Sequence, residues 1–204
     1  MDMGNAKDEQ EKQVGRRAGN VDTKNDISQA AIELFSKNGM KQTTMRQIAT
    51  RAKVDPALIV HYFCSKKQLF LDSVVLPLKE RELELFEEVF SNPDNTTVGE
   101  RLSRAFATLI VEDEESQLFV AIIRSAASDE EAVDIMRNVV KNALLNKFKD
   151  HIPGPNRELK ASILGAQMLG IVMARYIIKL EPIASATVDD LVLYLAPRVQ
   201  TYFE

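Results

Sequence analysis

The chain has 204 residues, of which 45% are hydrophobic, and it carries 26 basic side chains, 30 acidic ones and a single cysteine. This length can bury a sizeable core and suits one small and one larger domain. The lone cysteine excludes an internal disulfide, no continuous apolar run reaches the ~18–20 residues of a membrane span, and the first residues lack the apolar core of a signal peptide. We therefore expect a soluble protein in a reducing, cytoplasmic setting.

The first predicted helix follows a polar tail. Residues 1–22 hold few apolar side chains, so they cannot bury enough surface to fold, and we expect them to be disordered. Apolar side chains then recur with helical spacing from Ile27 to Phe35. Asn38 and Gly39 should end this helix, because glycine tolerates the left-handed conformation of a helix end.

Capping residues mark the next two helices. Thr44 and Gln47 have the spacing of a capping box, in which a hydroxyl and an amide satisfy free backbone N–H groups at a helix start. Asp55 is a good N-cap and Pro56 a good first helical residue, so a third helix is predicted from there to about Tyr62.

The second and third predicted helices are too short to bury a core alone, but packed on the first helix they can share one. Its members are expected to be Leu34, Phe35, Ile48, Ala49, Val54, Ile59 and Phe63. Two short helices joined by a tight turn over a supporting helix form a helix-turn-helix. Residues 23–70 are therefore predicted to be a DNA-binding domain.

The charge distribution supports this prediction. Residues 22–70 hold 8 basic and 4 acidic side chains, a net charge of +4, whereas residues 71–204 hold 14 and 22, a net charge of −8. A basic head on an acidic body would bind a polyanion with one end only.

The same region resembles the DNA-binding region of TetR-family regulators. The family pattern combines an A-x-x-L-F helix ending in Gly, a T-T-x-x-x-I-A helix, a short helix ending in an aromatic pair, and S-K-x-x-L. It is matched here by Ala31, Leu34, Phe35, Gly39, Thr43, Thr44, Ile48, Ala49, Tyr62, Phe63, Ser65, Lys66 and Leu69. This resemblance covers about a quarter of the chain and implies a dimeric DNA-binding regulator with an effector cavity.

Two departures from the family pattern concern DNA reading. Lys53 stands in the turn where the family usually has glycine, and Ala57, Leu58 and Val60 make the exposed face of the third helix unusually apolar. Lys66, in the first turn of a fourth helix, is expected to anchor a phosphate. The residues predicted to bind DNA are Thr44, Arg46, Asp55, Pro56, Ala57, Leu58, Val60, His61, Tyr62 and Lys66. Arg16 and Arg17 in the tail either enter a minor groove or remain solvated.

The remainder of the chain is predicted to be helical, which makes the protein all-α. A capping box at Ser65 and Gln68 opens the fourth helix, and Pro77 should kink or break it, because proline has no N–H to donate. Further helices are predicted over 78–90, from Thr97, from Ser128, over 157–180 and from Thr187 to Phe203. Residues 71–204 are thus expected to form one larger helical domain for ligand binding and dimerisation.

The last two predicted helices carry more apolar surface than one core requires. Small residues recur every four positions along the first of them, which lets another helix approach closely. The residues predicted to form a dimer interface are Ala166, Gly170, Ala174, Leu191, Tyr194 and Leu195. The alternative is that both helices only build the core of a single protomer.

Bulky and polar side chains of the larger domain suggest a ligand pocket. The residues predicted to line it are Phe86, Phe106, Phe119, Ile123, Arg124, Met136, Gln167, Ile171 and Arg175. Aromatic and methionine side chains at helical spacing are more often ordinary core, and arginines more often make surface pairs, so both interpretations remain open for each residue.

Other chemistry is nearly absent from the sequence. The two histidines, His61 and His151, are far apart, and we find neither a phosphate loop nor a serine elbow, so we predict no metal, no cofactor and no enzymatic activity. Cys64 is expected to be a small packing residue rather than a redox switch. Two functions remain: a dimeric repressor released from an inverted-repeat operator by a small molecule, or a helical ligand-binding or interaction protein whose helix-turn-helix does not read DNA.

Overall fold

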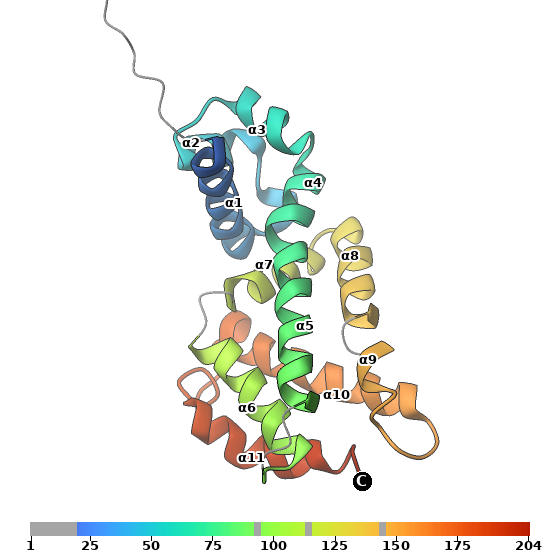
Figure 1. The fold of residues 1–204 in the computed structure, drawn as a ribbon. Helices are drawn as coiled ribbons and strands as arrows, with labels where there is room; N and C mark the ends of the chain where they lie inside the picture. The colour runs from blue at the N-terminus through green and yellow to red at the C-terminus, as the bar shows by residue number, and fades with distance from the viewer. Residues whose placement is uncertain (1–19, 92–94, 113–115, 143–145) are drawn as a thin grey trace, which may run out of the picture.

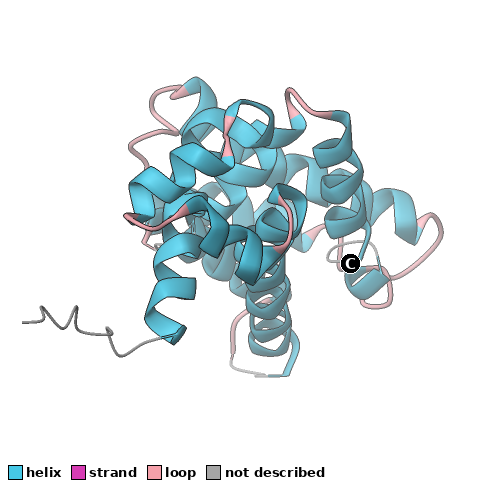
Figure 2. Cartoon of the chain, turned by 90° about the horizontal axis from the view of Figure 1, so that it is seen from above, coloured by secondary structure: helices cyan, strands magenta, loops and turns pink. Residues whose placement is uncertain are grey.

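Helices joined by short loops make up the part of the chain that the structure describes (Figure 1). The computed structural model describes residues 20–91, 95–112, 116–142 and 146–204, and these contain helix and loop but no strand (Figure 2). The elements are α1 (Asn20–Gln42), α2 (Met45–Ala52), α3 (Pro56–Phe63), α4 (Lys66–Phe70), η1 (Leu71–Val75), α5 (Leu76–Ser91), α6 (Val98–Val111), α7 (Ser116–Ala126), α8 (Glu130–Val140), α9 (Asn146–Phe148), α10 (Arg157–Val172), η3 (Met173–Ile178) and α11 (Val188–Gln200). The all-α prediction is confirmed.

The N-terminal helices α1, α2 and α3 form a small head at one end of the molecule (Figure 1). Gly39 interrupts α1 with φ 75° and ψ 169°, as its position in the sequence predicts. The capping box of α2 is complete, because the Thr44 hydroxyl accepts from the Gln47 backbone and the Gln47 side chain accepts from the Thr44 backbone N–H. Lys53 ends α2 in the left-handed region at φ 56°, a conformation that glycine would adopt with less strain.

The core of the head is close to the predicted one. Phe35, Ile48, Ile59 and Phe63 are fully buried, whereas Leu34 and Val54 are only partly buried at its edge. α3 begins as predicted, with the Asp55 carboxylate accepting from the Ala57 N–H at 2.7 Å and Pro56 in the first turn. The predicted tail, with Arg16 and Arg17, lies outside the described residues, apart from its last three residues, which already belong to α1.

A continuous helical stretch, formed by α4, η1 and α5, leads from the head into the rest of the molecule (Figure 1). Pro77 neither ends nor interrupts it, so a break there is not observed. One turn earlier, Leu71–Val75 is a π-helix, in which the Leu76 N–H donates to the Leu71 carbonyl, five residues back. A π-turn shifts the hydrogen-bond register of the helix. We infer that this shift lets the helix continue through Pro77, which has no N–H to donate.

The remaining helices form a body below the head (Figure 1). α6 and α11 cross closely at Gly99, where an added Cβ would lie 2.5 Å from the Gln200 backbone nitrogen. α8 is capped by Asp129, one residue after the predicted Ser128. Thr187 caps α11 in a full capping box, and its hydrogen bonds lower the pKa of the Asp190 carboxyl.

Candidate nucleic-acid interface and internal cavity

The outer surface of α2 and α3 carries most of the residues predicted to bind DNA. The exposed members are Thr44, Arg46, Asp55, Pro56, Ala57, Leu58, Val60 and His61, and Tyr62 is partly buried. Leu58 is 38% exposed and Val60 is 53% exposed, although α3 buries Ile59 and Phe63 on its other side. The helix therefore presents apolar side chains on its outer face.

Lys66 differs from its expected role. Its ammonium group turns inward and donates to the carbonyl oxygens of Met40, at 2.8 Å, and Thr43, at 3.0 Å. These carbonyls follow the interruption of α1 at Gly39, where the helix no longer supplies donors. Lys66 thus joins the segment before α2 to the start of α4, and two of its three N–H groups serve the fold rather than a phosphate.

Two further details beside α4 depart from the sequence predictions. The Ser65 hydroxyl accepts from the Gln68 N–H, but the Gln68 side chain donates to Asp72 instead of completing a capping box. Cys64 is exposed and has φ 61°, so it is not a packing residue. It ends α3, where its backbone N–H donates to the Val60 carbonyl.

The head packs on the body mainly through α1 and α7, and three specific contacts join the two. The backbone N–H of Met40 donates to the buried Ser125 hydroxyl of α7 at 2.9 Å. A Cβ added at Gly39 would lie 3.1 Å from the carbonyl oxygen of Arg124, so the backbones approach closely there. Lys67 of α4 forms an ion pair of 2.7 Å with Glu131 in the first turn of α8. Sequence reasoning missed all three contacts, because each joins residues distant in the chain.

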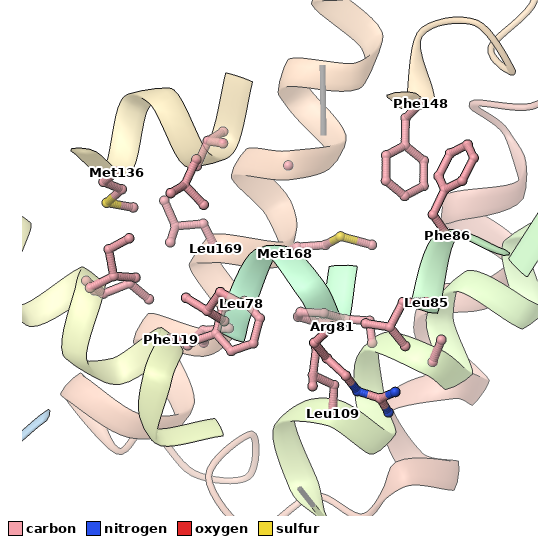
Figure 3. Close-up of a pocket in the computed structure, with 18 of the residues that line it drawn as sticks. Leu78, Arg81, Leu85, Phe86, Leu109, Phe119, Met136, Phe148, Met168 and Leu169 are labelled. Carbon is pink, nitrogen blue, oxygen red and sulfur yellow. The ribbon is translucent and has the colours of Figure 1, made fainter. Parts of the chain in front are cut away.

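The body contains a cavity of about 160 Å³ lined by α5, α6, α7, α8, α9 and α10. Figure 3 shows Met136 and Phe119 toward one end, Phe86 and Phe148 toward the other, and Met168 between them. The wall consists of Leu78, Arg81, Leu85, Phe86, Leu102, Ala105, Phe106, Leu109, Phe119, Ile122, Ile123, Met136, Val139, Val140, Phe148, Gly165, Met168, Leu169 and Val172.

Five of the nine residues predicted to line a pocket lie in this wall: Phe86, Phe106, Phe119, Ile123 and Met136. Arg124, Gln167, Ile171 and Arg175 do not, which corrects the prediction for them. The Arg175 guanidinium instead donates to the carbonyls of Ile183 and Ala186, at 2.8 and 2.9 Å, and so holds the loop before α11. Arg81, the charged residue of the wall, was missed because a charged side chain on α5 suggests a solvated face.

Exposed apolar and small side chains lie on α10, η3 and α11. Ala166 and Gly170 are exposed, Ala174 is partly exposed, and nothing lies within 4 Å of a Cβ added at Gly170. On α11, Leu193 and Tyr194 are 66% and 65% exposed. Leu191 and Leu195, which were predicted at a dimer interface, are instead buried in the protomer, because their side of α11 packs on α6.

The stretch Arg157–Ile178 is long and apolar enough to cross a membrane by length and composition alone, with a mean hydropathy of 1.6 in its most apolar window. Polar and charged side chains are scattered through this stretch, so it is not a continuous apolar run. One side of α10 packs in the body through Ala161, Leu164, Met168 and Val172. The described residues contain no cluster of three or more metal-ligating side chains.

Two family models match separate parts of the chain. Residues 27–72 match the model for bacterial regulatory proteins of the tetR family, and residues 96–203 match the model for a tetracyclin repressor-like C-terminal domain. The chain is 40% identical over 63 residues to the transcriptional repressor NicS of Pseudomonas putida, which is 30% of either chain. It is 35% identical over 66 residues to the transcriptional regulator UidR of Escherichia coli K12, or 33% of that protein. The matched part therefore spans about a third of these curated relatives.

Solved structures match over nearly the full length. A TetR-family regulator from Streptomyces coelicolor is 30% identical, with a TM-score of 0.60, and the match covers 93% of this chain and 98% of that one. The fatty acid degradation regulator FadR of Bacillus halodurans has a TM-score of 0.70 at 14% identity, over 86% of this chain and 97% of that one, and shows a shared fold. With one family model matching more than half of its residues and a relative that is similar over nearly all of them, this chain belongs to the TetR family of bacterial transcriptional regulators.

Proposed function

We propose that the protein is a dimeric transcriptional repressor that binds an inverted-repeat operator through α2 and α3 and is released by a small-molecule effector. The observation that carries the proposal is the exposed outer face of α3, held on a rigid head whose charge is opposite to that of the body. The partners are double-stranded DNA, a second copy of the chain and an effector, in the cytoplasm. The proposal assigns no cofactor, no catalytic role and no membrane association.

The proposed DNA complex places α3 in the major groove, with α2 crossing the backbone beside it, as in other helix-turn-helix proteins. Arg46, exposed at the start of α2, then reaches a phosphate or a guanine. Leu58 and Val60 meet the floor of the groove. The net charge of +4 over residues 22–70 supplies the salt-dependent part of the affinity.

The proposed dimer covers the exposed apolar face of α10 and α11. Ile163, 48% exposed, and the open side of Gly170 lie on α10, and Leu193 and Tyr194 lie on α11. Large exposed apolar surfaces rimmed by polar residues are typical of protein interfaces. Two copies joined there would present two heads to two half-sites, which should lie about one helical turn, ~34–36 Å, or a multiple of it apart.

Release by an effector can act through α7. One side of this helix lines the cavity with Phe119, Ile122 and Ile123, and its C-terminal end holds the head through Ser125. A ligand that shifts α7 would therefore move the head relative to the body. Because such coupling is reciprocal, operator DNA would lower the affinity for effector by the same factor as the effector lowers the affinity for DNA.

A gel-shift titration at several salt concentrations tests DNA binding, first on the promoter beside the gene and then on duplexes selected from a random pool. We expect selected duplexes to share an inverted repeat, and Arg46→Ala to weaken binding and lower the salt slope. Arg137→Ala is a matched control, because this arginine lies on α8 and pairs with Asp134. If the wild-type protein enriches no sequence from the pool and shifts no duplex at low salt, it is instead a ligand-binding or interaction protein whose helix-turn-helix does not read DNA.

Light scattering tests the dimer separately from DNA binding. Tyr194→Asp would bury a charge at the proposed interface, so we expect a monomer that keeps its fold. Leu83→Asp makes a similar change at an exposed leucine of α5, outside the proposed interface, and should leave the dimer intact. A wild type that is monomeric at all concentrations would contradict the dimer.

A further inference from the structure

The cavity of the body has almost no polar wall. Of its 19 lining residues, 18 have apolar side chains or are glycine. They include four phenylalanines, Phe86, Phe106, Phe119 and Phe148, and two methionines, Met136 and Met168. These side chains come from all six helices that line the space, so each of these helices contributes apolar wall.

Arg81 is the exception, but its charged end does not face the cavity. In Figure 3 the guanidinium points away from Phe86 and Phe148, beside Leu109. Its Nη1 donates to the Glu84 carboxylate on the same helix, at 2.9 Å. Arg81 thus lines the cavity with its aliphatic stem, as long charged side chains commonly do, and its charge is already matched by Glu84.

These observations define what the cavity can hold. A charged or strongly polar ligand would lose its hydration without gaining a hydrogen bond, which opposes binding. An apolar ligand has no hydrogen bonds to water to lose, and it gains contacts with the phenylalanine rings and methionine sulfur atoms of the wall. An engineered cavity of about 150 Å³ with leucine, isoleucine and phenylalanine walls binds benzene, so a cavity of this size fits a single ring with a short substituent.

We propose that the effector site takes a small uncharged aromatic hydrocarbon, of the size of benzene to ethylbenzene, and rejects the corresponding carboxylates. This inference rests on the proposed function, because it names the ligand class of the cavity assigned there to the effector. Selectivity comes from the wall: apart from Arg81, whose Nη1 is paired with Glu84, no lining side chain carries a charge that could bind an anion.

Ethylbenzene and phenylacetate form a matched pair of probes, because the second replaces the terminal methyl group of the first with a carboxylate. Binding to the full-length protein without DNA is measured by calorimetric titration and by the thermal unfolding midpoint, which a ligand of the folded state raises. We expect ethylbenzene to raise the midpoint and to bind at least about tenfold more tightly than phenylacetate. Equal or tighter binding of phenylacetate, or no binding of ethylbenzene, would overturn the inference.

Two variants locate the binding site. Ala105→Leu fills part of the cavity and should abolish ethylbenzene binding, whereas Ala127→Leu, outside the wall, should not.

A third variant tests the role of the Arg81 charge. Arg81→Met keeps the aliphatic stem and removes the charge, so ethylbenzene should bind within about twofold of the wild type. A large loss of ethylbenzene binding in Arg81→Met, with an unchanged unfolding midpoint, would mean that the guanidinium takes part and that the site is not apolar.

A gel shift on the selected operator separates this inference from the proposed function. If ethylbenzene binds the free protein but leaves the operator complex intact, the ligand class stands and release by an effector fails. If phenylacetate dissolves the complex while ethylbenzene does not, release stands and the ligand class is wrong.

Discussion

The backbone N–H of Met40 donates a 2.9 Å hydrogen bond to the hydroxyl of Ser125, which joins the interrupted end of α1 to the end of α7. Both groups are buried, and the same hydroxyl donates to the Ala121 carbonyl, so neither end of the bond has water as an alternative. One side of α7 also lines the cavity. This bond therefore connects the DNA-binding head to a helix that lines the cavity.

Ser125→Ala should weaken this connection. The Met40 N–H would remain buried without an acceptor, which costs about 1–3 kcal/mol of folding free energy. We expect a lower free energy of unfolding and a smaller ratio between operator affinity without and with effector. Ser103→Ala is a matched control, because Ser103 is as deeply buried and its hydroxyl makes no hydrogen bond within the described part of the chain. Equal effector ratios in wild type and Ser125→Ala would exclude this bond from the coupling.

Lys66→Met should destabilise the head with little change in phosphate contacts. The variant keeps the aliphatic stem but removes the donor shared by the carbonyls of Met40 and Thr43, a loss of about 1–3 kcal/mol. We expect a lower unfolding midpoint and nearly the wild-type dependence of operator affinity on salt. Arg46→Met should show the opposite pattern, with unchanged stability and a salt slope lower by roughly 1 for each lost phosphate contact. A comparable fall in slope for Lys66→Met would restore its expected role as a phosphate anchor.

How much of the structure can be predicted from the sequence depends on how far apart in the chain the interacting residues lie. Gly39, the Thr44 capping box and the Asp55-Pro56 start of α3 act within one helical turn, so these boundaries are correct. Leu191 and Leu195 were assigned to the wrong face of α11, because that face is set by the close crossing with α6 at Gly99, a contact between distant residues.

The cavity shows the same limit. Phe119 and Met136 line it, but helical spacing alone cannot separate a cavity wall from a filled core. Arg175 was predicted to line the pocket because it is a polar residue among apolar ones, yet its guanidinium donates to two loop carbonyls. A sequence pattern does not show which backbone carbonyls need a donor. For this reason it predicted neither the pairing of Arg175 nor the inward orientation of the Lys66 ammonium group.

Thymine methyl groups should contribute to operator recognition. Leu58 and Val60 are exposed on α3, and apolar side chains in the major groove make their best base contact with the methyl group of thymine. We expect a T-rich step in each half-site, and replacement of those thymines by uracil should weaken binding measurably. Uracil placed in the flanks of the same duplex serves as control. Unchanged affinity after substitution throughout both half-sites would show that α3 does not read methyl groups.

Pro77→Ala tests whether the π-turn of the connecting helix takes part in induction. The proline follows Leu71–Val75, whose wide hydrogen bonds accommodate its missing N–H. Alanine supplies that N–H, so we expect η1 to adopt α-helical bonds, which would rotate the head relative to the body and change the ratio of operator affinities with and without effector. The dimer and the fold should persist, because Pro77 is only partly buried. Pro197→Ala makes the same change inside α11, far from the head in Figure 1, and should leave that ratio unchanged. An unaltered ratio in Pro77→Ala, together with a circular dichroism spectrum that matches the wild type, would mean that the π-turn only accommodates the proline, and that coupling runs through the contacts of the head with α7 and α8.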